Sequence, residues 1–259
     1  MSNKRDQIYQ HPRGEKENEN AKSGSFRFDA RVADVFSDMI SRSVPGYLQI
    51  LDMLPTLVKQ YRQQSIGEQN YYDLGCSLGA GMLAIAKGVN DSSTTTTEPS
   101  VNIIGIDNSE AMLAQAETTL APFNQYNFEL ITQDIQKTDI NNAAMVLMNF
   151  TLQFIPLVER DALIKKIYDG LLPNGTLVLS EKIKFDDPKE QQALIDIHHQ
   201  YKADQGYSQL EIAQKRDAIE DVLIPETLAK HTERLSRAGF SVITPWVQNL
   251  QFISILAIK

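Results

Sequence analysis

The sequence predicts an α/β fold: a doubly wound, mostly parallel sheet that ends in a C-terminal antiparallel hairpin. Three observations predict it. A strand-like run leads into a glycine-rich turn at residues 71–81, strand-like and helix-like runs then alternate up to residue 181, and two closely spaced strand-like runs end the chain. Such alternation is typical of parallel strands joined by right-handed helical crossovers. We therefore expect a single domain at residues 25–259.

The strand and turn at residues 71–81 form the first candidate site. An aromatic and apolar run leads to Asp73, and Gly75, Gly79 and Gly81 follow before a helix-like run begins. Glycine accepts φ > 0 and lets a ligand approach the main chain, and a helix start offers unpaired N–H groups to polar atoms. The turn by itself is equally compatible with an ordinary βα connection, so its interpretation depends on the following strands.

A second apolar run, residues 101–107, ends in Asp107 and is followed by Asn108. In a nucleotide-binding βαβ unit, an acid at the end of the second strand accepts hydrogen bonds from ribose hydroxyls, usually ~20 residues after the glycines. The interval is longer here because a polar, threonine-rich run occupies residues 90–100. We interpret that run as a surface loop insertion, which costs little closure entropy.

Two further strand ends carry polar residues. Residues 128–132 form a predicted third strand that leads to Asp134. Residues 143–150 are nearly continuously apolar, as in a central parallel strand buried on both faces, yet the polar Asn149 lies near the end of this run. Ligands of open α/β sheets bind at the carboxyl ends of the strands, so Asp134 and Asn149 are candidate ligand contacts.

Capping and punctuating residues predict the remaining elements. In chain order they are a helix at 110–120 capped by Ser109, a helix at 158–171, a turn at 173–175, a strand at 176–180, a helix at 231–238 stopped by Gly239, and hairpin strands at 240–247 and 250–258 at the sheet edge.

The N-terminal region divides into a tail and a helical cap. Residues 1–24 are polar and charged, which predicts a mobile tail and no secretory signal. Residues 26–62 contain two helix-like runs and form a predicted cap. By analogy with other α/β domains, we expect the cap to fold over the ligand. Tyr47 then either contacts the ligand or is an ordinary tyrosine of the core or the surface. Residues 188–222 form a predicted helical insert.

Composition narrows the function. The formal net charge is −8, which argues against direct, charge-driven binding of nucleic acid. A single cysteine, Cys76, excludes an internal disulfide and favours a reducing compartment, so we expect a cytoplasmic protein.

The sequence also argues against a membrane span, a cysteine nucleophile and a metal site. No apolar run is long enough to predict a membrane span. Cys76 has no evident histidine partner for nucleophilic catalysis. The adjacent His198 and His199 would point apart on a helix, so we expect no metal site.

The combination of glycine turn, strand-end residues and C-terminal hairpin resembles the Rossmann-like class I S-adenosylmethionine-dependent methyltransferase fold over residues 45–259. One position departs from that pattern. Those proteins commonly show Asp/Glu-x-Gly-x-Gly-x-Gly, whereas Ser77 stands here at the middle glycine. With this variant, the chain resembles the carboxy-S-adenosylmethionine synthases over nearly all residues after 26. The motifs that carry this resemblance are Arg42-Ser-Val-Pro-Gly-Tyr47, Asp73-Leu-Gly-Cys-Ser-Leu-Gly79, Ile106-Asp-Asn-Ser109, Asn149-Phe-Thr-Leu-Gln-Phe154, Leu179-Ser-Glu-Lys182 and Gln214-Lys-Arg216.

This resemblance implies a homodimer that converts S-adenosylmethionine and prephenate into carboxy-S-adenosylmethionine and phenylpyruvate. The product then serves a separate enzyme that modifies the tRNA wobble uridine. The resemblance also implies that the hydroxyl of prephenate, as it departs, takes a proton from the methyl group of S-adenosylmethionine. No protein residue is therefore assigned as the base. Arg216, which spacing alone would place on a solvated helix face, becomes the implied partner of the new carboxylate. The other implied contacts of S-adenosylmethionine are Tyr47, Gly75, Cys76, Ser77, Asp107, Asn108, Asp134, Ile135 and Asn149.

Two other functions stay open on the sequence. One is a conventional methyltransferase of the same fold that acts on a small molecule or on tRNA. The other is a non-catalytic protein that binds the cofactor or acts as a scaffold.

Overall fold

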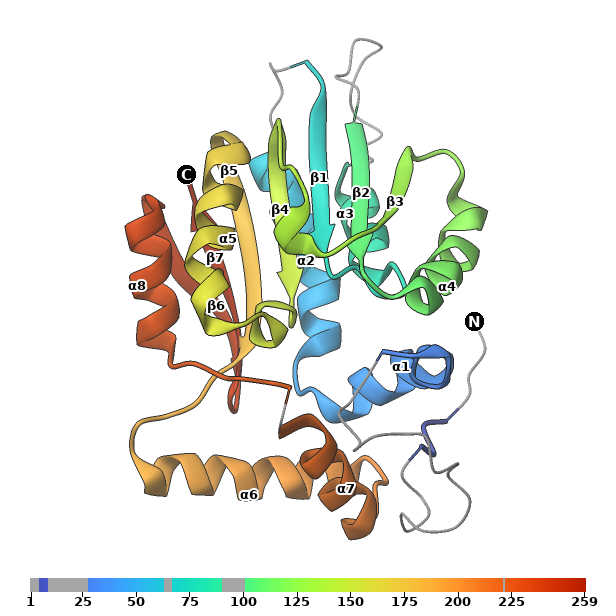
Figure 1. Ribbon diagram of the computed structural model, residues 1–259, viewed down its shortest axis with the longest axis vertical. Helices are drawn as coiled ribbons and strands as arrows, with labels where there is room; N and C mark the ends of the chain where they lie inside the picture. Colours follow the sequence, from blue (N-terminus) through green and yellow to red (C-terminus); the bar gives the residue numbers. More distant parts are fainter. Residues whose placement is uncertain (1–4, 9–27, 63–66, 90–100, 221) are drawn as a thin grey trace.

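The computed structural model describes residues 5–8, 28–62, 67–89, 101–220 and 222–259. Within these ranges the strands are β1 (Gln69–Leu74), β2 (Val101–Asp107), β3 (Phe128–Thr132), β4 (Ala143–Asn149), β5 (Leu171–Lys182), β6 (Val242–Asn249) and β7 (Phe252–Ile258). They form one sheet in the order β3-β2-β1-β4-β5-β7-β6 (Figure 1). β1 to β5 pair in parallel, whereas β7 is antiparallel to both β5 and β6. The predicted fold class is confirmed.

Helices cover both faces of this sheet (Figure 1). On one face lie α2 (Tyr47–Tyr61), α3 (Ala80–Val89) and α4 (Glu110–Leu120), and on the other lie α5 (Leu157–Gly170) and α8 (Leu228–Ala238). Neighbouring residues of a strand point to opposite faces. Tyr71 accordingly packs with Leu54 and Ile85, while Tyr72 packs in the core that contains Ile164 and Leu235. Both faces of β4 are buried, as its apolar run predicts.

Three more helices lie across the carboxyl ends of the parallel strands (Figure 1): α1 (Ala30–Ser43), α6 (Pro188–Asp204) and α7 (Gln209–Glu220). The predicted cap supplies α1, and the predicted insert supplies α6 and α7. His198 of α6 joins them, because its Nε2 lies 2.8 Å from the carbonyl oxygen of Ser43 at the end of α1. Cap and insert therefore meet over the edge of the sheet where ligands of this fold class bind.

The predicted N-terminal tail is described at residues 5–8, and this short stretch packs against the cap and the insert. Asp6 is only 2% exposed. Its carboxylate accepts hydrogen bonds from Lys215 Nζ at 2.5 Å and from the Tyr207 hydroxyl at 2.8 Å. A buried ammonium needs such a counter-charge, which explains the departure from a free tail. The rest of the tail and the threonine-rich loop at 90–100 lie outside the described residues.

Helix boundaries follow side-chain caps. The predicted α4 and its Ser109 cap are confirmed, since the Ser109 hydroxyl accepts from the Met112 N–H. Of the two helix-like runs predicted within residues 26–62, the first begins as a helix at Ala30 because Asp29 caps it, and residues 26–27 lie outside the described part. α5 is displaced by one residue from its predicted bounds. The last helix begins three residues earlier than predicted, because Thr227 caps it, and Gly239 ends it with φ 117° as predicted.

Two strand predictions need correction. β5 begins at Leu171, so the turn expected at 173–175 is a local distortion within the strand, where Asn174 has φ 60° and the pairing with β4 shifts register. In the hairpin, Leu250 has φ 54° and belongs to the turn, so β7 begins at Phe252. Both positive φ values lie in the left-handed region, which ends regular strand geometry locally.

Candidate functional site

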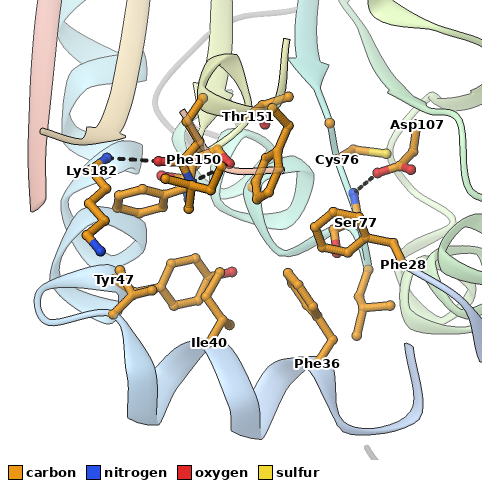
Figure 2. A pocket seen from close by; sticks show the side chains of 18 of the residues that line it. Phe28, Phe36, Ile40, Tyr47, Cys76, Ser77, Asp107, Phe150, Thr151 and Lys182 are labelled. Atoms are coloured by element: carbon orange, nitrogen blue, oxygen red, sulfur yellow. Dashed lines mark hydrogen bonds between the residues drawn. The ribbon is translucent and has the colours of Figure 1, made fainter. Parts of the chain in front are cut away.

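A cavity of about 400 Å³ lies between the carboxyl ends of the strands and the helices α1, α6 and α7. Side chains from both layers point into it (Figure 2). It is lined by all the predicted ligand contacts except Arg216, namely Tyr47, Gly75, Cys76, Ser77, Asp107, Asn108, Asp134, Ile135 and Asn149. The tertiary structure therefore brings these residues from five separate segments into one cavity, while their individual roles stay predictions.

The glycine turn forms one wall of the cavity. Gly75 has φ +82°, and a Cβ at this position would lie 2.4 Å from the Thr151 hydroxyl oxygen. The N–H groups of Gly75 and Cys76 both donate to the carbonyl oxygen of Ile106, at 2.8 and 3.0 Å, which fixes the turn against β2. Glycine is required at position 75 for its conformation and for the space it leaves.

Ser77, which stands where related motifs have glycine, takes a left-handed conformation with φ 51°. Asp107 supports this conformation, because its carboxylate accepts the Ser77 N–H at 3.0 Å (Figure 2). The same carboxylate accepts the Ser109 N–H at 2.9 Å. Asp107 thus joins the glycine turn to the start of α4. Burial raises the pKa of Asp107, and the two N–H donors act in the opposite direction.

Asn108 and Asp134 meet at the end of β2 and β3. The Asn108 side-chain amide donates to Asp134 Oδ1 at 3.1 Å, and Lys137 donates to the other carboxylate oxygen at 2.8 Å. The hydrogen bond from Lys137, followed by that from Asn108, lowers the pKa of Asp134, so this group stays ionised. Ile135, which is 5% exposed, supplies an apolar surface beside them. This end of the cavity therefore presents the apolar side chain of Ile135 next to hydrogen-bond acceptors.

Asn149 ends β4 inside the cavity. Its Oδ1 is buried and has no hydrogen-bond partner among the described residues. A buried polar atom without a partner is costly, so a donor from a ligand would stabilise it. The residues after it continue the cavity wall: Phe150 has φ 62° and packs its ring 6.5 Å from that of Tyr47.

Two acidic residues, Asp73 and Asp107, and the thiol of Cys76 line the cavity at the glycine turn. Asp73 is 2% exposed, and burial, with a smaller contribution from Asp107, raises its pKa to about 7. Cys76 is 4% exposed, and burial followed by the charges of Asp73 and Asp107 raises the pKa of its thiol. A thiol in this environment stays protonated and is a poor nucleophile. The two carboxyl groups favour a cationic ligand.

Arg216 does not line the cavity. It lies on α7 with 49% of its side chain exposed, and its guanidinium bonds the neighbouring Asp217, with Nη2 3.0 Å from Oδ1. In a single chain, the residue that the resemblance places beside the new carboxylate therefore lies outside the set of residues that line the cavity. Its predicted role stays a prediction.

Three cavity lysines were not predicted from the sequence: Lys182, Lys202 and Lys215. Lys182 ends β5, so the strand-end reasoning that identified Asp134 and Asn149 could also have identified it. Lys202 and Lys215 lie on helices with few apolar residues, where the sequence gives no sign of which face meets the sheet. Only the packing of α6 and α7 places them.

His198 also lines the cavity, 5% exposed, and burial, followed by the charge of Lys202, lowers its pKa to about 3. In its neutral form, His198 contacts the Ser43 carbonyl through Nε2 and so connects α6 to the end of α1.

Among the described residues, no group of three or more His, Cys, Asp or Glu side chains could hold a metal ion. None of the described helices has the length and apolar character that a membrane crossing requires.

The sheet order, the glycine turn and the strand-end cavity define the class I S-adenosylmethionine-dependent methyltransferase fold. A methyltransferase-domain family model matches residues 72–175. The chain also superposes on magnesium protoporphyrin IX methyltransferase of Synechocystis with bound S-adenosylmethionine, with a TM-score of 0.53, 15% identity and coverage of 92% of this chain and 86% of that one. Human N-acetylserotonin methyltransferase in complex with S-adenosylmethionine gives a TM-score of 0.54 at 14% identity, with coverage of 89% and 55%.

Sequence relatives define the family within this fold class. A carboxy-S-adenosyl-L-methionine synthase of Hahella chejuensis is 47% identical over the full length of both chains. The enzyme of the same name from Marinobacter nauticus is 48% identical, with coverage of 90% of each chain. The chain belongs to the carboxy-S-adenosyl-L-methionine synthase family, which confirms the resemblance seen in its motifs.

Proposed function

We propose that this protein is a cytoplasmic homodimer that converts S-adenosylmethionine and prephenate into carboxy-S-adenosylmethionine and phenylpyruvate. The product would supply the carboxymethyl donor to a separate enzyme that modifies the tRNA wobble uridine. The observation that carries this proposal is the full-length identity to relatives named for carboxy-S-adenosylmethionine synthesis. The cavity supports it, because it is lined by all the ligand contacts that the family resemblance implies except Arg216.

The residues of the cavity fit S-adenosylmethionine. The buried Oδ1 of Asn149 lacks a donor that the ligand's amino group would provide. Asp107 would accept from the ribose hydroxyls, and Asp134 from the adenine amine beside Ile135. When bound, S-adenosylmethionine supplies a sulfonium whose methyl protons are unusually acidic.

The chain contributes positioning, charge and exclusion of water. The carboxyl groups of Asp73 and Asp107 favour the positively charged ligand, and the helices α1, α6 and α7 cover it. Apolar side chains such as Phe150 and Phe252 keep the reacting region dry, which strengthens electrostatic interactions and protects a reactive carbanion from water. We assign no protein side chain as the base, since the departing hydroxyl of prephenate would take the proton and leave as water.

The test of this proposal is a single incubation of the purified protein with both substrates. We expect phenylpyruvate to accumulate together with a sulfonium compound heavier than S-adenosylmethionine by one CO₂, as detected by mass spectrometry. A demethylated product, formed only when an acceptor is added, would support a conventional methyltransferase. Binding of S-adenosylmethionine without any product would support a non-catalytic protein.

The Arg216→Ala variant tests the proposed partner of the new carboxylate. Removing one member of a charge pair typically costs ~2–5 kcal/mol in binding, so we expect a large loss of affinity for carboxy-S-adenosylmethionine and little change for S-adenosylmethionine. Because Arg216 is half exposed and is not among the residues that line the cavity of one chain, this role requires movement of α7 or the α7 of a second copy. Calorimetric titration of both ligands gives the answer, and equal affinities of wild type and variant for the carboxylated ligand would remove Arg216 from the site.

A further inference from the structure

One end of the cavity is basic. Lys182 at the end of β5, Lys202 on α6 and Lys215 on α7 all line it. The Lys182 side chain points into the cavity beside Tyr47 (Figure 2). Lys202 follows His198 by four residues, so both lie on the same face of α6 and both reach the cavity. Three ammonium groups from three elements therefore converge on one region.

The order of the strands separates this basic end from the proposed S-adenosylmethionine contacts at the strand ends. Those contacts lie at or just after the ends of β3, β2, β1 and β4, which are consecutive in the sheet, whereas Lys182 ends β5, which is next in line, and Tyr47 of α2 lies beside Lys182 (Figure 2). Neighbouring strands are ~4.8 Å apart, so β5 lies ~10 Å beyond the glycine turn that follows β1. The cavity thus has an acidic end with Asp107 and Asp134, and a basic end that extends past the contacts at the strand ends.

The lysines differ in how their charge is balanced. Lys215 has a carboxylate partner, since its Nζ lies 2.5 Å from Asp6 and 2.9 Å from the Tyr207 hydroxyl. Lys202 makes no ion pair with any carboxylate of the described residues. Burial, followed by the charges of Lys182 and Lys215, lowers the pKa of Lys202 to about 7. An anion beside Lys202 would supply a counter-charge to this ammonium group.

Aromatic rings lie next to this basic end. Phe252 packs against the rings of Phe150 at 6.0 Å and His198 at 5.0 Å, and Tyr47 lies 6.5 Å from Phe150, all as distances between centroids. These four side chains line the cavity. An unsaturated six-membered ring suits such a surface, and the carboxylate of a short side chain on that ring would lie within reach of the lysines.

We propose that Lys202 and Lys182 form an anion subsite that binds the side-chain carboxylate of the acid co-substrate, the one that phenylpyruvate keeps, and orients its ring against Phe150 and Phe252. This inference rests on the proposed function, which supplies the acid as prephenate. It assigns the lysines to the incoming acid and leaves Arg216 as the proposed partner of the carboxylate formed on the sulfonium ligand. Lys215 forms an ion pair with Asp6 and so joins α7 to the N-terminal segment that packs on it.

The first test compares Lys202→Met with wild type in steady-state kinetics. Methionine keeps much of the side-chain volume and removes the charge. Loss of a charge-assisted hydrogen bond should raise KM for prephenate about 10- to 100-fold, while the Kd for S-adenosylmethionine changes by less than about twofold. Lys202→Arg should restore part of the loss. The control is Lys230→Met, an exposed lysine on α8 paired with Glu233, which should leave both constants unchanged.

The second test measures binding without turnover. Phenylpyruvate is titrated calorimetrically into enzyme saturated with S-adenosylhomocysteine, from about pH 6 to about pH 9. Basic groups surround Lys202: Lys182 and Lys215 face it from β5 and α7, and His198 and His199 lie on its own helix. A carboxylate would raise the pKa of Lys202, so binding takes up a proton and weakens as the pH rises above about 7. Lys202→Met should bind more weakly and lose this pH dependence.

The two tests have separate outcomes. If wild type forms no carboxylated product, the proposed function fails, yet the titration still decides whether the lysines bind an aromatic carboxylate. If wild type is active and Lys202→Met has an unchanged KM for prephenate, the subsite is wrong while the function stands. Undetectable binding of phenylpyruvate to wild type, or identical binding to both proteins, overturns the subsite. A selective loss of S-adenosylmethionine affinity in Lys202→Met also overturns it, because the lysines would then hold the amino-acid carboxylate of that ligand.

Discussion

Replacing Asp107 with alanine is expected to weaken binding of both S-adenosylmethionine and carboxy-S-adenosylmethionine by about 30- to 1,000-fold. The carboxylate has two functions in the site. It accepts the N–H groups of Ser77 and Ser109, which hold the glycine turn and the start of α4 in place, and it is the proposed acceptor for the ribose hydroxyls. Because the ribose is common to both ligands, the two affinities should fall together, which calorimetric titration measures directly.

Two further variants separate local structure from charge. Asp107→Asn keeps one side-chain oxygen for the backbone N–H groups and loses the negative charge, so we expect a smaller loss than with alanine. Asp169→Ala is the matched control, since Asp169 is an exposed residue paired with Lys165 far from the cavity. Unchanged affinity of Asp107→Ala for both ligands would refute the proposed ribose contact.

Replacing Arg160 with methionine is expected to lower the free energy of unfolding by about 3–5 kcal/mol. Arg160 is completely buried. Its guanidinium donates to the carbonyl oxygens of Ile155, Gln153 and Ile224 at 2.9–3.1 Å and to the Glu226 carboxylate at 2.6 Å. Methionine would leave all these acceptors without their donor in a buried setting. Urea unfolding, followed by circular dichroism, measures the difference.

The control for this variant is Arg237→Met. Arg237 is exposed and pairs with Asp161 on the surface, and exposed ion pairs contribute about 0–1 kcal/mol.

The Glu226 carboxylate of this network makes the stability depend on pH. Although burial acts in the opposite direction, the hydrogen bonds and charges of Arg234 and Arg160 lower the pKa of Glu226 to about 2. The stabilisation by this carboxylate is therefore present above its unfolded-state pKa and is lost as the pH falls toward 2. A stability loss in Arg160→Met no larger than that of the control would contradict the role of this network.

The strand-end residues show how far sequence patterns reach. Asp107, Asp134 and Asn149 were identified because polar residues at the ends of apolar runs are unusual, and parallel strands bring their carboxyl ends to one edge. Short-range patterns also predicted α4 with its cap. Boundaries such as the start of β5 were predicted less well, because register shifts and left-handed residues there depend on the neighbouring strand.

Contacts between distant segments explain what the sequence could not predict. Asp6 and Lys215 pair across 209 positions, and His198 and Ser43 across 155. No local pattern indicates such pairs, since α6 and α7 are polar helices whose buried face is set by what they pack against. The same packing turns Lys202 into the cavity and leaves Arg216 half exposed.

By itself, the sequence determined the sheet, the glycine turn, the line of strand-end side chains and the family, because each depends on residues close together in the chain or on motifs. Only the tertiary structure decided the basic end of the cavity, the burial of Asp6 and the outward position of Arg216. The physical reason is that the free energy of a charged side chain depends on its solvent exposure and on the charges around it, and both are set when the distant cap and insert come together.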